Sequence, residues 1–252
     1  PYTNRARDVA ATLLLWAYFI AGHLFLFFPF YGFAWCFSAN RAAAFQALNH
    51  HFFKLFFAIV RRVIPGSGFT VDPAIKTITG GAVVCNHISY LDSIWMIANF
   101  KRQITIVRSD LFEVPIFGWY LRASGYIPSR VNPAHADRII VRMEQLGDFF
   151  QRGGVLFVFP EGTRAADGAL RAFNKSIFQI ARRHGAPLHV LCVTNTDKVF
   201  PPGRFLINSA GSGPVTLKLL ESLPGEQTAR KGALDLRDRA HNRIAAYMAA
   251  TD

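Results

Sequence analysis

The sequence predicts an α/β fold in which a mixed, largely parallel sheet is flanked by helices, with two apolar helices ahead of it. Two observations predict this fold class. From about residue 66 onward, short β-rich runs alternate with helical patterns, which is typical of a sheet with helices packed on its faces. The chain of 252 residues is long enough for one large α/β domain plus a small appendage. We therefore expect a helical segment over 1–65 and an α/β domain over 66–252.

The first predicted element is an apolar helix near the amino terminus. Residues 9–40 contain no Lys, Arg, Asp or Glu, and 9–28 alone would form a helix of about 30 Å, enough to cross a bilayer core. Pro29, Tyr31 and Gly32 are expected to end this helix and allow a turn. A second, amphipathic helix is expected over 41–63, where apolar residues recur at helical spacing.

We interpret these two helices as a membrane anchor. Basic residues flank the apolar run on both sides, at Arg5, Arg7, Arg41, Lys54, Arg61 and Arg62. Positive charge on both flanks favours a hairpin or monotopic anchor whose ends share one face of the membrane. One true membrane span and an apolar helix buried in the soluble core are the alternatives. The run is too long for a signal peptide.

The predicted sheet and its helices follow in order along the chain. Strands are expected at 69–71, 82–85, 104–107, 155–159, 188–193 and 215–219, where β-branched and aromatic residues cluster. Helices are expected at 91–99, 134–150, 175–184 and 228–249, where apolar residues recur at helical spacing.

The composition limits the partners. The net charge of +12 calls for an anionic partner, either nucleic acid or a membrane rich in acidic lipids. No zinc-knuckle, RNP-like or recognition-helix pattern supports nucleic acid. Basic residues beside an apolar amino terminus favour the membrane. The three cysteines have no metal-ligand spacing, so we expect buried thiols and no metal site.

Two short polar motifs each follow a predicted strand, and the first is NHISYLD at 86–92. Its His87 and Asp92 lie five positions apart. A neutral imidazole can take a proton from an attacking hydroxyl when a carboxylate holds its other ring nitrogen. The alternative is a loop histidine followed by an aspartate that the helix dipole favours. Because no serine or cysteine nucleophile has a recognisable context, an activated hydroxyl would belong to a substrate.

The second motif is FPEGTR at 159–164. A glycine after a strand lets backbone N–H groups approach an anion, and Arg164 is able to grip phosphate or carboxylate with two hydrogen bonds. Glu161 would orient that arginine or meet a substrate hydroxyl. The alternative is an ordinary turn with a surface ion pair. Arg130 follows another short β-like run and would suit a doubly charged phosphate.

With these motifs in this order, the chain resembles the lysophospholipid acyltransferase family, whose best-known members are the 1-acylglycerol-3-phosphate acyltransferases. HISYLD matches the family's HxxxxD motif, and FPEGTR matches a later one fully. VPIFGWYLRASGYIPSR resembles the block between them, and FNKSIFQIA, with Lys175, resembles the segment that usually follows. Ser109 stands where the family often has lysine, with Arg108 beside it. Ser176 and His189 replace the usual glycine and proline, and GYIPSR is about one residue shorter than usual.

The resemblance implies roles for individual residues. His87 would deprotonate the acceptor hydroxyl for attack on an acyl thioester, with Asp92 orienting it. Substrate binding would fall to residues of the later blocks, namely Arg130, Glu161, Gly162, Thr163, Arg164 and Lys175.

It also implies a reaction and a location. We expect transfer of a fatty acyl chain from acyl-CoA or acyl carrier protein to lysophosphatidic acid (1-acyl-sn-glycerol 3-phosphate), giving phosphatidic acid in phospholipid biosynthesis. No cofactor is implied beyond the acyl donor, and the expected location is the cytoplasmic face of the inner membrane. The alternatives are another lysolipid acceptor such as a lyso-ornithine lipid, a catalytically silent lipid-binding protein, and a lipid hydrolase.

Overall fold

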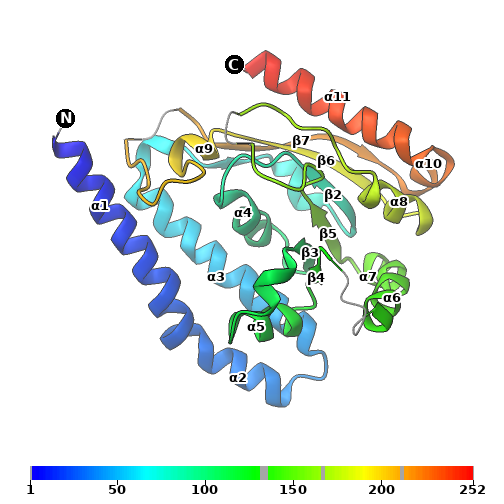
Figure 1. Cartoon of the computed structure of the whole chain (residues 1–252), viewed down its shortest axis with the longest axis horizontal. Coiled ribbons are helices and arrows are strands. Elements are labelled where there is room, and N and C mark those ends of the chain that lie inside the picture. Colours follow the sequence, from blue (N-terminus) through cyan, green and yellow to red (C-terminus); the bar gives the residue numbers. More distant parts are fainter. Residues whose placement is uncertain (1, 131–135, 166–167, 211–212, 252) are drawn as a thin grey trace.

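A largely parallel sheet forms the centre of the computed structural model, which describes residues 2–130, 136–165, 168–210 and 213–251 (Figure 1). Within these residues the sheet has seven strands in the order β1-β7-β6-β2-β5-β3-β4. Every neighbouring pair is parallel except β6 and β7, which are antiparallel. The predicted fold class is confirmed. The strands are β1 Thr70–Val71, β2 Gly81–Cys85, β3 Gln103–Val107, β4 Ile127–Pro128, β5 Val155–Val158, β6 Leu188–Thr194 and β7 Thr216–Leu223.

The central strands are buried on both faces. All five residues of β2 are buried, and so are six of the seven in β6. This explains why their sequences are continuous apolar runs without polar alternation, as expected for strands covered by helices on both sides. The six predicted strands are all present, and the short β-like run before Arg130 forms β4.

Helices cover both faces of the sheet. In Figure 1, α8, α10 and α11 lie on one side, and α3, α4 and α5 lie on the other. These helices, with the shorter ones between them, are α3 Arg41–Val63, α4 Leu91–Asn99, α5 Phe117–Ala123, α6 Ala136–Glu144, α7 Leu146–Gln151, α8 Ser176–Arg183, α9 Thr196–Val199, α10 Gly225–Arg230 and α11 Ala233–Thr251. Three 3₁₀ turns, η2 Pro65–Ser67, η3 Pro73–Thr77 and η4 Ser109–Phe112, complete the connections.

Two predicted helices are each divided in the structure. The helix predicted over 228–249 is interrupted between α10 and α11, because Lys231 is extended (φ −92°, ψ 153°). The helix predicted over 134–150 is represented by α6 and α7, which are separated at Gln145; its first two positions lie outside the described residues.

The prediction that Pro29, Tyr31 and Gly32 end the first helix is wrong. The chain stays helical through α1 (Tyr2–Ala17), a π-helical stretch η1 (Tyr18–Phe27) and α2 (Phe28–Phe37). Pro29 lies in the first turn of α2, directly after the π-helix, where the N–H of Phe28 donates to the carbonyl of His23. A proline is tolerated at a first turn because its missing N–H is not needed there. The turn instead comes at 38–40.

The second amphipathic helix has the predicted bounds. Asn40 precedes α3, and its side chain accepts a hydrogen bond from the N–H of Ala43 at 3.0 Å. Figure 1 shows α3 running back beside the first helix. Its buried phenylalanines belong to the same core as the sheet, and α3 also packs against α4. The domain division after residue 65 stays a prediction.

The first helix leaves most of its apolar surface uncovered. Arg5–Phe37 is long and apolar enough to cross a membrane, and only 17% of its apolar window is buried. Phe25 and Phe37 are 79% and 74% exposed. This exposure argues against the alternative of a helix buried in the soluble core. Hairpin and single span both remain predictions.

The cysteines only partly follow the expectation of buried thiols. Cys85 and Cys192 are buried in β2 and β6, whereas Cys36 is exposed. Cys36 lies on α2, whose apolar residues face outward, so an apolar sequence context did not mean burial there. Among the described residues, no group of three or more His, Cys, Asp and Glu side chains could hold a metal ion.

Candidate active site

The first motif lies at the carboxyl end of β2, as predicted. Asn86 follows the strand and joins it to β6, donating from Nδ2 to the Val193 carbonyl at 2.9 Å and accepting the Val193 N–H at 2.8 Å. Its side chain thus extends the hydrogen bonding of the sheet by one position. The chain then leaves the sheet at His87 and enters α4 at Leu91. Ser89 accepts the N–H of Leu91 at 3.2 Å, which helps to start that helix.

His87 and Asp92 are in contact. The His87 Nδ1 lies 2.9 Å from Asp92 Oδ2. The same carboxylate oxygen accepts the N–H groups of Ile88 and Ser89, both at 2.7 Å. The hydroxyl of Thr196 donates to the other oxygen at 2.6 Å. These four hydrogen bonds fix the orientation of a side chain that is only 1% exposed.

The imidazole is set up to accept a proton on its other nitrogen. Because Nδ1 donates to an acceptor carboxylate, Nε2 carries the free lone pair. One face of the ring stacks on Phe159, with centroids 4.2 Å apart and planes 18° apart. These contacts hold the ring in place. Because His87 remains 8% exposed, a substrate is still able to reach it.

Glu161 connects the two motifs. One carboxylate oxygen accepts the N–H of His87 at 2.7 Å, and the other accepts the N–H of Arg171 at 2.9 Å. Burial raises the pKa of Glu161 above its ordinary value, and the two N–H donors act in the opposite direction. Glu161 therefore holds the backbone of His87, whereas the sequence suggested that it orients Arg164 or meets a substrate hydroxyl.

Residues at the end of FPEGTR and directly after it also contact the first motif. Gly162 has φ 73°, a conformation that favours glycine. The N–H of Ala165 donates to the carbonyl of His87 at 3.0 Å, a second link between the motifs. The Arg164 guanidinium lies over the Tyr90 ring, 3.8 Å from its centroid. Tyr90 belongs to HISYLD itself, so each motif holds a side chain of the other.

A cavity of about 590 Å³ opens at this site. His87, Gly162, Thr163 and Arg164 line it together. Most of its other lining residues are apolar; they come mainly from α4, β3 and α5 and include Phe53 of α3 and Phe19 of η1. Among the described residues, two arginines and no acidic side chain line this cavity. The second arginine is Arg108, which the sequence marked only as the neighbour of Ser109.

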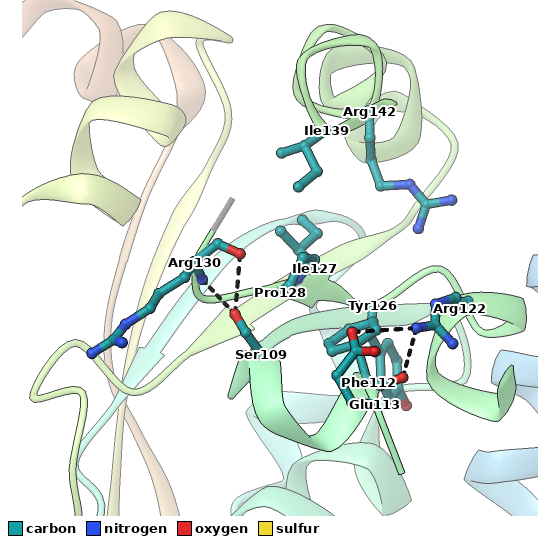
Figure 2. Close-up of a pocket in the computed structure, with 10 residues that line it drawn as sticks. All are labelled: Ser109, Phe112, Glu113, Arg122, Tyr126, Ile127, Pro128, Arg130, Ile139 and Arg142. Atoms are coloured by element: carbon teal, nitrogen blue, oxygen red, sulfur yellow. Dashed lines mark hydrogen bonds and ion pairs between the residues drawn. The ribbon is translucent and has the colours of Figure 1, made fainter. Parts of the chain in front are cut away.

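Two residues assigned to substrate binding lie elsewhere. Lys175 is exposed just before α8 and does not line the cavity, although its neighbours Asn174 and Ser176 do. Arg130 lines a separate cavity of about 350 Å³ (Figure 2). Its N–H donates to Ser109 Oγ at 2.7 Å, which fixes its backbone, while its guanidinium extends away from Arg122 and Arg142.

Thr196 is a part of the site that the sequence did not indicate. It begins α9, far along the chain from the dyad, and it is fully buried against Asp92. A single threonine carries no motif, so only the fold reveals this contact. Phe200, directly after α9, contributes its carbonyl, which accepts the Ser89 hydroxyl at 2.8 Å.

Comparison with known proteins identifies a family for the part of the chain that carries both motifs. Residues 72–194 match the family model described as Acyltransferase. This segment belongs to the Acyltransferase family. It contains β2 through β6 and both motifs.

Curated relatives carry related names. The chain is 32% identical over 126 residues to a chloroplast 1-acyl-sn-glycerol-3-phosphate acyltransferase of Arabidopsis thaliana, a match that covers 50% of this chain and 35% of the relative. It is 27% identical to the 1-acyl-sn-glycerol-3-phosphate acyltransferase of Salmonella typhimurium, with 71% of each chain covered. It is also 30% identical over 105 residues to the lyso-ornithine lipid O-acyltransferase of Rhodobacter capsulatus, covering 42% of this chain and 37% of that one. The chain therefore spans about a third of the length of the plant relative.

One solved structure shares the fold over nearly the whole chain. It is the 1-acyl-sn-glycerophosphate (LPA) acyltransferase PlsC from Thermotoga maritima, with a TM-score of 0.70. The match covers 96% of this chain and 95% of that one at 23% identity. At this identity the likeness extends to the fold, including the amino-terminal helices.

Proposed function

We propose that this protein is an acyltransferase that moves a fatty acyl chain from a thioester, acyl-CoA or acyl carrier protein, to 1-acyl-sn-glycerol 3-phosphate, producing phosphatidic acid. One observation carries the proposal: the histidine of a His–Asp dyad and an arginine line the same largely apolar cavity. The names of the curated relatives support the reaction class and the acceptor.

The reaction follows from the geometry of the dyad. Nε2 of His87 removes the proton of the acceptor hydroxyl as its oxygen attacks the thioester carbonyl. Asp92, hydrogen-bonded to Nδ1 at 2.9 Å, stabilises the imidazolium that forms. When the tetrahedral intermediate collapses, the carbon–sulfur bond breaks and the thiolate takes the proton back from His87. General-base catalysis of this kind contributes about 10²–10⁴-fold.

Arginines at the opening would hold the acceptor's phosphate. Stacking on Tyr90 uses the flat face of the Arg164 guanidinium, so its in-plane N–H groups remain free to bind phosphate oxygens. Arg108 is on the same cavity wall, where it already pairs with Asp110. Arg130, which lines a different cavity, is a weaker candidate for this role.

The apolar part of the cavity would receive an acyl chain. Its far end reaches Phe19 in the long apolar helix, so bound lipid and anchor would be in contact. We infer that the chain associates with a membrane through this helix, with the opening at the lipid surface, where an acceptor enters without leaving the bilayer. The cytoplasmic face of the inner membrane is the proposed side, since acyl-CoA and acyl carrier protein are cytoplasmic donors.

A panel of acceptors tests the assignment. The purified chain is incubated with acyl-CoA and with lysophosphatidic acid, other lysophospholipids or a lyso-ornithine lipid, and the released thiol is measured. We expect release with lysophosphatidic acid well above that with the others. The name of the Rhodobacter capsulatus relative supports a lyso-ornithine lipid as the second candidate acceptor. Faster thiol release with that lipid would overturn lysophosphatidic acid as the acceptor but would leave the acyl-transfer mechanism unchanged.

Arg164→Ala should chiefly raise the KM for the acceptor, because the guanidinium binds its phosphate and takes no part in proton transfer. A charge-assisted hydrogen bond is worth about 1.5–3 kcal/mol, which corresponds to roughly tenfold to a hundredfold in KM. Arg164→Lys should recover part of the loss. Steady-state kinetics with each substrate varied in turn measure this. A change confined to the KM of the thioester would contradict the phosphate assignment.

Thr196→Val should lower kcat on the order of tenfold and leave both KM values nearly unchanged. The variant removes the hydroxyl that donates to Asp92, leaving a buried carboxylate oxygen unsatisfied, which costs about 1–3 kcal/mol. Thr196→Ser keeps the hydroxyl and should keep most of the activity. Equal kcat values for the valine and serine variants would show that this hydrogen bond does not position the dyad.

A further inference from the structure

A third cavity lies at the amino ends of the parallel strands, whereas His87 lies at the carboxyl end of β2. It has a volume of about 410 Å³ and is lined by Arg102 and Arg152, which precede the amino ends of β3 and β5. The first turns of α3 also line it, through Ala42, Ala43 and Gln46. The proposed reaction makes no use of this cavity.

Two buried polar atoms at this cavity have no partner among the described residues. Gln46 is 3% exposed; its Nε2 donates to the carbonyl of Ser124 at 2.9 Å, but its Oε1 accepts nothing. Arg102 donates from Nη1 to the carbonyl of Arg152 at 3.0 Å, while its buried Nε has no acceptor. Buried polar atoms are nearly always hydrogen-bonded, so each unpaired one calls for an explanation. Gln46 and Arg102, the residues that carry these two atoms, both line the cavity.

The cavity is also positively charged. The described residues that line it include Arg102, Arg142 and Arg152 but only one acidic side chain, Asp148. Arg142 comes from α6, is half-buried, and has no hydrogen bond or ion pair among the described residues. Burial lowers its pKa, which reflects a guanidinium desolvated without an anion beside it. Its Nη1 lies against the backbone at Gly125, where a Cβ atom would be 2.9 Å away. Figure 2 shows its guanidinium pointing away from Arg130.

The surroundings favour an amphipathic ligand. The positive end of the α3 dipole faces the cavity, because Ala42 and Ala43 belong to the first turn of that 23-residue helix. Asn40, at the turn before α3, also lines the cavity. The preceding α2 exposes Phe33 and Phe37 by 65% and 74%. An apolar surface thus adjoins a basic, hydrogen-bonding cavity.

We propose that this cavity binds the phosphodiester headgroup of an anionic membrane lipid, such as a phosphoglycerol headgroup. The phosphate oxygens accept hydrogen bonds from the arginines that line the cavity. The acyl chains of the lipid lie along the exposed face of α2. This site is separate from the acceptor site and does not depend on the proposed reaction. It fixes the turn between the two amino-terminal helices at the lipid surface.

Calorimetric titration of the full chain in an uncharged detergent tests the proposal. The probes are dihexanoylphosphatidylglycerol, dihexanoylphosphatidylcholine and inorganic phosphate. We expect the phosphatidylglycerol to bind more tightly than either of the others. Arg142→Gln should weaken its binding by about tenfold or more, since a charge-assisted hydrogen bond is lost. Arg183→Gln makes the same charge change at an exposed position of α8 and should have no effect.

Controls on folding and activity show whether a loss of lipid binding comes from the cavity itself. Arg142 is only half-buried and has no hydrogen bond or ion pair within the described part of the chain, so Arg142→Gln should fold, which thermal unfolding checks. Its acyl transfer in detergent should be unchanged. If it does not fold, Arg142→Lys is used instead; it keeps the charge and loses the paired N–H geometry. Phosphatidylglycerol binding that is equal in wild type and variant overturns the site. Inorganic phosphate binding as tightly as the lipid, with the same loss in the variant, overturns the lipid as its ligand.

Discussion

His87→Ala should reduce acyl transfer to background, a loss of about 10²–10⁴-fold or more, because no other described group in the cavity is arranged to take the acceptor's proton. The loss should fall on kcat, since the arginines that bind the phosphate remain. The measurement is phosphatidic acid formed from acyl-CoA and lysophosphatidic acid by the purified variant.

Folding must be checked separately for this variant. Removing the imidazole leaves a gap beside Phe159, against which the ring stacks at 4.2 Å. His87→Gln fills more of that gap and should be as inactive as the alanine variant. Both should bind vesicles as wild type does, because the exposed apolar helix is unchanged. If either variant is folded and its turnover is close to that of the wild type, His87 is not the general base.

Asp92→Asn should lower kcat by about 10³-fold, because the carboxylate both holds the imidazole and stabilises its protonated form. An amide has only one acceptor oxygen. Whichever way it turns, its NH₂ group meets donors, either the N–H groups of Ile88 and Ser89 or the hydroxyl of Thr196. The variant therefore no longer fixes the tautomer of His87, and its folded state is also less stable.

The two effects can be separated. Thermal unfolding reports the loss of stability, and kcat measured well below the unfolding temperature reports catalysis. Asp238→Asn makes the same chemical change on the exposed face of α11 and serves as the control. An Asp92→Asn enzyme with kcat within a few-fold of wild type would mean that the carboxylate only supports the fold.

The sequence predicted best where a pattern is local. The bounds of α3 and α4 follow from apolar periodicity, and the spacing of five positions between His87 and Asp92, across the start of a helix, permits their contact. Glu161 was marked because it belongs to a motif, but its partner was not predicted. That partner is a backbone N–H 74 residues away, which no spacing could indicate.

Other features depend on the fold as a whole. Pro29 was expected to end a helix, but the π-helical turns before it leave a position where its missing N–H does no harm. Arg130 was grouped with Arg164 because both follow short strands. The structure instead brings Arg108 to the reaction cavity, while Arg130 lines the neighbouring one. The packing of the helices decides on which side of a strand end a cavity forms. No local pattern in a single sequence indicates how those helices pack.

The most direct test of the central claim is the stoichiometry of one reaction. Thiol released from acyl-CoA and phosphatidic acid formed are both measured with the purified chain, with and without lysophosphatidic acid. The account predicts equal amounts of the two products when the acceptor is present and almost no thiol when it is absent. Thiol released without an acceptor would indicate a hydrolase, and no thiol under either condition would indicate a lipid-binding protein; each would contradict it.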